Sequence, residues 1–360
     1  MFLVHLVCYW AEAPAGWALM PQPLKAYNSL AANFNFNYYQ MKYCIRLVGI
    51  TFLSFFYLAS FSQNKYIHPE GKFITVNGAK LWIESLGKGE PLFMIAGGPG
   101  NSHVNLHVFD TLKNSCQLIF IDNFGRGKSD TAAHLKEYSV SRDVEDIEGI
   151  RKALGFEKIS IYGQSYGTVV AQLYAVKYAH HLKKLIIESG FYNAKMWQEN
   201  DDNSNRQFAE QDPELWDSLM VLRKKGYRSS DSLHYTLYAG FHIFLVYAYC
   251  PDNKRFEDND YPNNYNTRLY YQLVGHDADF HVGNDIAKFD VTAQLKYLKM
   301  PILIMAGRYD RVSVPKFSVL YKKYCPQAKF VMFEKSGHNQ ELEEPGETFA
   351  LISQFLLDKN

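Results

Sequence analysis

Residues 158–167 read KISIYGQSYG, an apolar segment that runs directly into a G-x-S-x-G motif. The apolar part, 158–162, predicts a buried strand, and the segment 166–178 predicts a helix. Glycines two positions before and two positions after Ser165 allow a turn that is too tight for bulky neighbours. Such a turn holds the serine hydroxyl exposed at the end of the strand. The stretch therefore predicts a strand, a sharp turn that carries a nucleophilic serine, and a helix.

A serine hydroxyl becomes a nucleophile when a base takes its proton and a third group orients that base. Asp310 follows the predicted strand 302–306, and His338 follows the predicted strand 330–333. Both side chains come at carboxyl ends of predicted strands, where open parallel sheets bind their ligands. The chain order serine, acid, histidine is the order expected for this kind of turn. The sequence thus predicts a catalytic triad of Ser165, Asp310 and His338.

A glycine-rich segment supplies the other feature that acyl transfer needs. Residues 96–100 read AGGPG and follow the predicted strand 91–96. Glycines let backbone N–H groups approach a substrate oxygen closely, and the residue after the nucleophile provides a second such group. We expect the backbone N–H groups of Gly98 and Tyr166 to form an oxyanion hole.

The rest of the chain alternates strands with helices. The predicted strands are 73–76, 80–84, 91–96, 117–121, 158–162, 184–187, 302–306 and 330–333, and the predicted helices are 140–154, 166–178 and 347–357. This alternation is typical of an α/β fold with a mostly parallel central sheet and helices on both faces.

Residues 191–290 interrupt the alternation and predict an inserted helical cap. The insert begins with the acidic segment 199–217 and continues with the aromatic segment 235–249. The aromatic segment is too short and too polar to span a membrane. We expect residues 63–190 and 291–360 to form the core into which the cap is inserted.

Composition argues against several other classes of protein. Lys and Arg total 38, Asp and Glu total 37, and the net charge of +1 argues against a nucleic-acid binder. The content of 47% hydrophobic and 16% aromatic residues argues against a disordered chain. Five cysteines without a C-x-x-C pair argue against a disulfide framework or a zinc ribbon. The sequence leaves open the disulfide state of Cys116, Cys250 and Cys325.

Residues 41–62 have the layout of a secretory signal peptide, with two basic residues, an apolar run and small residues at a cleavage site. We expect Met41 to be the true start and residues 1–40 to be an upstream extension. The mature protein is then exported, either to the periplasm or out of the cell. A membrane anchor formed by residues 47–62 is the alternative.

From about residue 72 to its end, the sequence resembles the α/β-hydrolase superfamily, and within it the proline iminopeptidase-like group of serine peptidases. That group carries the motifs H-G-G-P-G, D-Q-R-G-x-G-x-S, G-x-S-x-G, G-R-x-D and a late G-H. The counterparts in this chain, in the same order, are 96–100, 122–129, 163–167, 307–310 and 337–338. Ala96 and Phe124 replace the histidine and the arginine of the group, and neither position belongs to the triad.

The resemblance implies a serine hydrolase that works through an acyl-enzyme without a cofactor or a metal. It implies an aminopeptidase that releases N-terminal residues from short peptides, and members of the group hold the free amine with cap carboxylates. The candidates are the carboxylates of segment 199–217 and Glu188. A carboxylic ester or lactone hydrolase is the alternative, and a non-catalytic binding protein of this fold is a more distant one. We expect no nucleic-acid partner and no stable membrane partner.

Three further groups of residues are weaker candidates. Residues 276–281 read HDADFH, whose ligand types suit a zinc-like ion, although their spacing meets no established pattern. His103 and His107 follow the glycine-rich segment and are candidates to face the active site. Aromatic side chains such as Phe241, Phe244 and Tyr247 are candidates to line an apolar pocket, with packing inside the cap as the favoured alternative.

Overall fold

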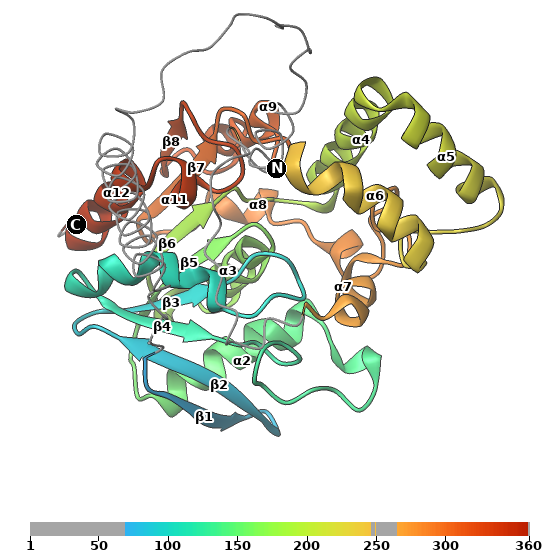
Figure 1. The fold of residues 1–360 in the computed structure, drawn as a ribbon. Helices are drawn as coiled ribbons and strands as arrows, with labels where there is room; N and C mark the ends of the chain where they lie inside the picture. Colours follow the sequence, from blue (N-terminus) through green and yellow to red (C-terminus); the bar gives the residue numbers. More distant parts are fainter. Residues whose placement is uncertain (1–68, 246–248, 250–264, 359–360) are drawn as a thin grey trace, which may run out of the picture. The chain divides into compact units, whose positions relative to one another are not determined.

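The computed structural model describes residues 69–245, 249 and 265–358. Its centre is an eight-stranded sheet with the strand order β1-β2-β4-β3-β5-β6-β7-β8 (Figure 1). β1 pairs antiparallel with β2, and β2 pairs antiparallel with β4, whereas the remaining pairs are parallel. The predicted α/β fold with a mostly parallel sheet is therefore confirmed.

The element bounds follow the predicted segments closely. The strands are β1 Gly71–Val76, β2 Ala79–Leu86, β3 Pro91–Ile95, β4 Gln117–Ile121, β5 Ile159–Gln164, β6 Leu182–Glu188, β7 Ile302–Gly307 and β8 Lys329–Phe333. The longer helices are η1 Val104–Asn114, α2 Val140–Ala153, α3 Tyr166–Lys177, α4 Ala194–Gln211, α5 Pro213–Lys224, α6 Ser232–Leu245, α7 Thr267–Val274 and α12 Pro345–Leu357. The short ones are η2 Leu135–Glu137, η3 Ala179–His181, η4 Ile286–Lys288, α8 Thr292–Leu295, α9 Pro315–Ser318, α10 Tyr321–Tyr324 and α11 Gln340–Glu343.

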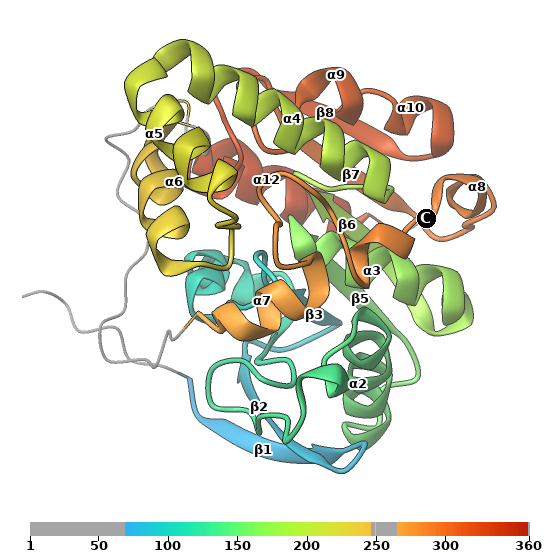
Figure 2. The ribbon, with the colours of Figure 1, turned by 90° about the vertical axis from the view of Figure 1, so that its right-hand side faces the viewer.

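Buried side chains alternate between the two faces of the sheet and build a core on each face. Phe93 and Ile95 of β3 pack on one face with residues of α2 and α3. Leu92 and Met94 of the same strand pack on the other face with residues of η1 and α12. A strand that is buried on both sides reads as a continuous apolar run, which explains the sequence PLFMI in β3. Helices therefore cover both faces of the sheet (Figures 1 and 2).

Helices α4 to α7 lie in the chain between β6 and β7, within the segment for which the sequence predicts a cap. In both views α4, α5 and α6 gather on one side of the molecule, and α7 lies between them and the core (Figures 1 and 2). Phe208, Leu219 and Tyr238 form a small apolar core among these helices. Arg223 of α5 adds a two-pronged ion pair with Asp277, at 2.6 and 2.7 Å.

Several sequence-based predictions concern residues outside this description. The predicted signal peptide 41–62, the extension 1–40 and Cys250 lie there. Within the described part of the chain, no helix combines the length and the apolar character that a membrane crossing requires. Cys116 and Cys325 are buried and free.

Candidate active site

The nucleophile turn joins β5 to α3. Ser165 has φ 50° and ψ −118°, a backbone conformation that residues other than glycine rarely adopt. Its N–H donates to the carbonyl of Glu188 at the end of β6, 2.9 Å away. A side chain at Gly163 would lie 2.5 Å from the carbonyl oxygen of Gly167, and one at Gly167 would collide with that of Ile95. Sterics therefore require both glycines of the motif, as the sequence predicts.

The other two predicted triad residues lie on the loops that follow β7 and β8. Nδ1 of His338 lies 2.9 Å from Oδ2 of Asp310, and each residue is only 2% exposed. Oδ1 of Asp310 accepts backbone N–H groups from Val312 and Ser313 at 2.8 and 2.7 Å. These bonds fix the carboxylate, which favours the imidazole tautomer with the proton on Nδ1 and leaves Nε2 as the basic nitrogen.

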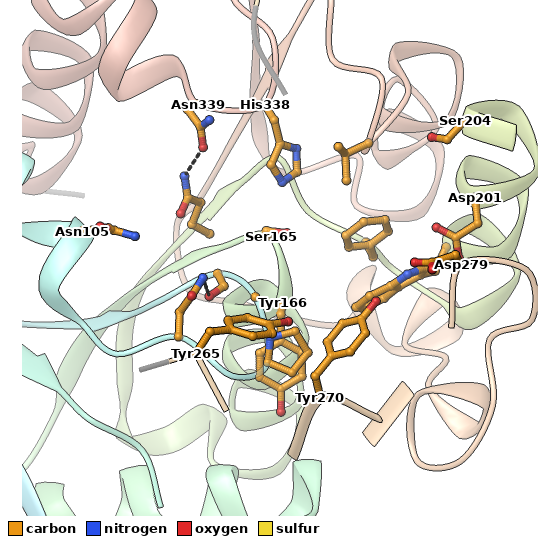
Figure 3. A pocket seen from close by; sticks show the side chains of 18 of the residues that line it. Asn105, Ser165, Tyr166, Asp201, Ser204, Tyr265, Tyr270, Asp279, His338 and Asn339 are labelled. Atoms are coloured by element: carbon orange, nitrogen blue, oxygen red, sulfur yellow. Dashed lines mark hydrogen bonds between the residues drawn. The ribbon is translucent and has the colours of Figure 1, made fainter. Parts of the chain in front are cut away.

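Ser165 and His338 line one pocket with a volume of about 400 Å³. In Figure 3 the imidazole of His338 points toward Ser165. Gly98 and Tyr166, the predicted oxyanion donors, line the same pocket. The structure thus gathers four of the predicted residues around one cavity and joins the fifth, Asp310, to the cavity through His338.

The glycine-rich segment after β3 is held in a defined turn. Gly98 has φ 62°, which glycine adopts without strain. The backbone N–H of Asn101 donates to the carbonyl of Gly98, and its side-chain Nδ2 donates to the carbonyl of Gly97, both at 3.0 Å. Nε of Arg126 donates to the carbonyl of Pro99 at 2.7 Å. These hydrogen bonds fix the backbone before and after Gly98.

Arg126 is itself held by a buried aspartate that sequence reasoning missed. Its Nη1 and Nη2 donate to Oδ1 and Oδ2 of Asp143 at 2.6 and 2.8 Å. The hydroxyl of Tyr166 donates to Asp143 Oδ2 at 2.6 Å. Burial disfavours the charge of Arg126, but the charge and hydrogen bonds of Asp143 outweigh burial and raise the pKa of Arg126. Asp143 escaped detection because an acid in the first turn of a helix usually faces solvent.

Two carboxyl groups from the cap face the same pocket. Asp201 comes from α4, and Asp279 comes from the loop after α7 (Figure 3). Burial, then repulsion from Asp279 and Asp202, raises the pKa of Asp201 well above its usual range. Burial and repulsion from Asp277, opposed by a hydrogen bond from Ser229, raise the pKa of Asp279 to about 6. Oδ2 of Asp201 is buried and accepts no hydrogen bond from the described residues.

These two carboxyls come from two separate segments of the sequence. Asp201 belongs to the acidic segment 199–217, from which it could not be singled out. Asp279 belongs to segment 276–281, the weak metal candidate. That segment does not gather as a metal cluster among the described residues, because Asp277 is paired with Arg223 and Asp279 faces the pocket.

Aromatic side chains form a wall of the pocket beside the two carboxyls. Phe191 and Trp197 stack with ring centroids 4.6 Å apart and an interplanar angle of 19°. Tyr238 and Tyr270 also line the cavity, and the hydroxyl of Tyr238 donates to Oδ1 of Asn205 at 2.9 Å. The wall thus offers apolar faces to a side chain that enters the pocket. From segment 235–249, Tyr235 and Tyr238 line the cavity. The side chains from 240 to 248, including Phe241, Phe244 and Tyr247, lie outside the description.

Glu188, a candidate for amine binding, does not line the pocket. Its side chain is fully buried behind the nucleophile turn and accepts a hydrogen bond from the hydroxyl of Tyr162. Glu341 of α11, three residues after His338, lines the pocket instead and accepts from Nε2 of Gln164 at 2.9 Å. Glu341 could not be predicted as a site residue, because acidic residues before a helix usually lie at its solvent-exposed N-terminus.

The expectation that His103 and His107 face the active site is wrong, because both are buried away from the pocket. Nδ1 of His103 lies 2.8 Å from Asp122 Oδ1, and Nε2 of His107 lies 3.2 Å from Glu84 Oε2. Among the described residues, Glu84, His103 and His107 bring metal-ligating atom types within 4.8 Å of one another. Burial lowers the pKa of His103, but Asp122 and then Glu84 outweigh it and raise the pKa to about 9. Contacts between these histidines and the carboxylates of Glu84 and Asp122 therefore hold the cluster together.

Comparison with known proteins places this geometry in context. The sequence profile of the alpha/beta hydrolase fold matches residues 90–345, which include Ser165, Asp310 and His338. A proline iminopeptidase from Heyndrickxia coagulans is 29% identical over 294 residues, which cover 81% of this chain and 99% of that protein. A proline iminopeptidase from Saccharolobus solfataricus is 28% identical over 283 residues, 75% of this chain and 86% of that protein.

The fold is also similar to solved structures. The crystal structure of proline iminopeptidase from Mycobacterium smegmatis matches with a TM-score of 0.65 and 20% identity. The match covers 80% of this chain and 97% of that one. The shared architecture therefore extends over nearly the whole of the compared enzyme.

Proposed function

This chain belongs to the alpha/beta hydrolase fold family and is a hydrolase, and we propose that it is a serine aminopeptidase of proline iminopeptidase type. Its substrates are short peptides from which it releases the N-terminal residue. One observation carries the proposal: Asp201 and Asp279 line the same pocket as Ser165 and His338. A pair of carboxyl groups at that place suits the cationic amine of the N-terminal residue whose carbonyl is attacked.

The proposed reaction follows from the arrangement around Ser165. Its Oγ attacks the carbonyl carbon while Nε2 of His338 takes the hydroxyl proton, and Asp310 stabilises the imidazolium that forms. The N–H groups of Gly98 and Tyr166 donate to the oxyanion. The intermediate collapses to an ester on Ser165 as His338 returns the proton to the leaving amine. Water, deprotonated by the same imidazole, then releases the amino acid.

The raised pKa values of the cap carboxyls fit an ammonium ligand. Burial and then repulsion from Asp279 favour the protonated form of Asp201. A bound ammonium group supplies positive charge and N–H donors, so it favours ionisation of both carboxyls. The buried Oδ2 of Asp201 would then gain a hydrogen-bond donor. Amine binding is therefore coupled to proton release from the pocket.

The relatives support the same assignment. The proline iminopeptidases of Heyndrickxia coagulans and Saccharolobus solfataricus align along most of their length with this chain. The stacked pair of Phe191 and Trp197 supplies flat apolar surface next to the carboxyls, which suits a small apolar N-terminal residue such as proline.

A substrate panel tests the proposal. Proline and alanine p-nitroanilides are compared with their N-acetyl forms and with p-nitrophenyl acetate and butyrate. We expect N-acetylation to lower kcat/KM by about 10- to 100-fold, because the charged hydrogen bonds to the carboxyls are lost. Hydrolysis of the esters alone, with no cleavage of either free anilide, would contradict the proposal and favour a carboxylic ester or lactone hydrolase.

We also propose that residues 41–62 direct export of the protein. The order of basic, apolar and small residues supports this role. The mass of the N-terminus of the exported protein tests it, and we expect a mature chain that starts just after residue 62. An exported chain that still carries Met41 would contradict cleavage and favour an anchor at 47–62.

A further inference from the structure

Two glutamates without a role in the proposed reaction lie beside the nucleophile turn. Glu188 ends β6 and is fully buried, and Glu341 lies in α11 and is 5% exposed. The hydroxyl of Tyr162 donates to Oε2 of Glu188, and Nε2 of Gln164 donates to Oε1 of Glu341. Gln164 is the strand partner of Glu188, so the amide that donates to Glu341 brings the two carboxyl groups side by side, and each acts on the pKa of the other.

One oxygen of each carboxyl group is left to contact the other carboxyl group. Oε1 of Glu188 and Oε2 of Glu341 are buried and receive no hydrogen from any other described residue. Two ionised carboxylates would repel each other there, and neither would have a hydrogen to donate. One proton between the two oxygens removes both difficulties. Burial raises the pKa of both carboxyl groups, and repulsion from Glu188 adds to the rise at Glu341, so the pair favours binding one proton.

We propose that the two carboxyl groups share one proton, and that the pair positions the nucleophile and the catalytic histidine. This inference rests on the proposed roles of Ser165 and His338. It adds to them two positioning residues, which act through other groups and do not touch the substrate carbonyl.

Hydrogen bonds connect the pair to both halves of the site. Glu341 holds Gln164, the residue before Ser165, at 2.9 Å. The same Nε2 of Gln164 donates to Oδ1 of Asn339 at 3.1 Å, on the histidine loop (Figure 3). The backbone carbonyl of Glu188 accepts the N–H of Ser165 at 2.9 Å. The carboxyl pair therefore bridges the nucleophile turn and the loop that carries the base.

The pair also places one negative charge near the imidazole. Besides Glu341, the titratable groups that act on Glu188 are Tyr162 from β5 and His338 from the loop after β8. Burial raises the pKa of Glu188, and the charge of His338 opposes that rise. By reciprocity, the charge on Glu188 stabilises the imidazolium that His338 becomes during attack.

The protonation state can be measured on the full chain without any assay of activity. Carbon-13 NMR of protein labelled only at glutamate Cδ separates protonated from ionised side chains. At neutral pH we expect a protonated glutamate signal that is absent from Glu341→Gln and present in Glu347→Gln, an exposed control in α12. The signal should also persist in Ser165→Ala, which separates this result from the proposed function. Complete ionisation of all glutamates at neutral pH would overturn the proposal.

Kinetics test the positioning role. Glu341→Ala should lower kcat by about tenfold, the effect of one lost charged hydrogen bond, and Glu341→Gln should restore most of it. The Glu188→Gln/Glu341→Gln double variant removes the net charge of the pair. We expect the acid limb of its kcat/KM profile to move to lower pH by about half a unit or more.

The single Glu341→Gln variant should leave the acid limb in place, because glutamine matches a protonated carboxyl in charge. Glu347→Gln should match the wild-type protein in both measurements. A Glu341→Gln variant as slow as Glu341→Ala would overturn the positioning role. So would a double variant whose acid limb coincides with that of the wild type.

Discussion

Arg126 and Asp143 form a buried, two-pronged ion pair, with Nη1–Oδ1 and Nη2–Oδ2 distances of 2.6 and 2.8 Å. The pair reaches both backbone segments of the proposed oxyanion hole. Arg126 donates to the carbonyl of Pro99, and the hydroxyl of Tyr166 donates to Asp143. One ion pair therefore fixes the positions of the two proposed N–H donors, Gly98 and Tyr166, relative to each other.

Removal of one partner should harm both stability and catalysis. Asp143→Asn leaves Arg126 buried without its counter-charge, which costs about 3–5 kcal/mol in a protein interior. We expect the free energy of unfolding in urea to fall by about that amount, and kcat to fall as the donors shift.

Glu334→Gln is the matched control, because it breaks the exposed ion pair with Arg308. Its cost should stay below about 1 kcal/mol. Equal losses in Asp143→Asn and in Glu334→Gln would show that the buried pair has no special part in stability.

Asp310 orients the proposed base, so its charge should matter more than its shape. Asp310→Asn keeps a carbonyl oxygen for the N–H groups of Val312 and Ser313 but favours the wrong tautomer of His338. We expect kcat for proline p-nitroanilide to fall by about three to four orders of magnitude, with KM little changed. Steady-state kinetics at neutral pH measure this, and a loss smaller than tenfold would assign the orienting role to another group.

The cap carboxyls should make aminoacyl binding sensitive to acid. The pKa of Asp279 is raised to about 6 and that of Asp201 is raised too, so protons compete with the amine as the pH falls. We expect KM for alanine p-nitroanilide to rise below about pH 6, and KM for p-nitrophenyl acetate to stay flat. Asp279→Asn should raise the anilide KM about tenfold at neutral pH. If KM for the ester rises over the same pH range, the titrating group lies outside the amine site.

The core of this site could be predicted from sequence because its constraints are local or topological. The glycines around Ser165 are fixed by contacts within one turn and with the neighbouring strand. Asp310 and His338 follow strands whose carboxyl ends meet at one edge of a parallel sheet. The predicted triad of Ser165, Asp310 and His338 then matches the chain order expected after such a turn.

The remaining residues depend on packing between distant segments. Asp201 and Asp279 come together only because α4 and the loop after α7 meet over the pocket. Glu188 and Glu341 lie on elements that are distant in the sequence, and no local pattern indicates that the two carboxyl groups meet. His103 follows the glycine-rich segment, yet its side chain turns into the core because Asp122 offers it a buried partner.

His103 should make the fold sensitive to alkali. Its pKa rises from 6.5 to about 9 on folding, since its carboxylate partners outweigh burial. A raised pKa gives stability that is complete below the unfolded value of 6.5 and is lost as the pH rises through about 9. We expect the free energy of unfolding to fall from neutral pH to about pH 9, and the fall to be smaller in His103→Gln. Urea titrations at both pH values check this, and parallel losses in the two proteins would assign the effect to other groups.

The central claim is that Ser165 is the nucleophile of an aminopeptidase. Its most direct test is the rate of proline p-nitroanilide hydrolysis by the wild-type protein and by Ser165→Ala, with circular dichroism to verify that both are folded. We expect turnover by the wild type and a loss of about three orders of magnitude or more in the variant. A folded Ser165→Ala protein that hydrolyses the anilide at the wild-type rate would contradict it.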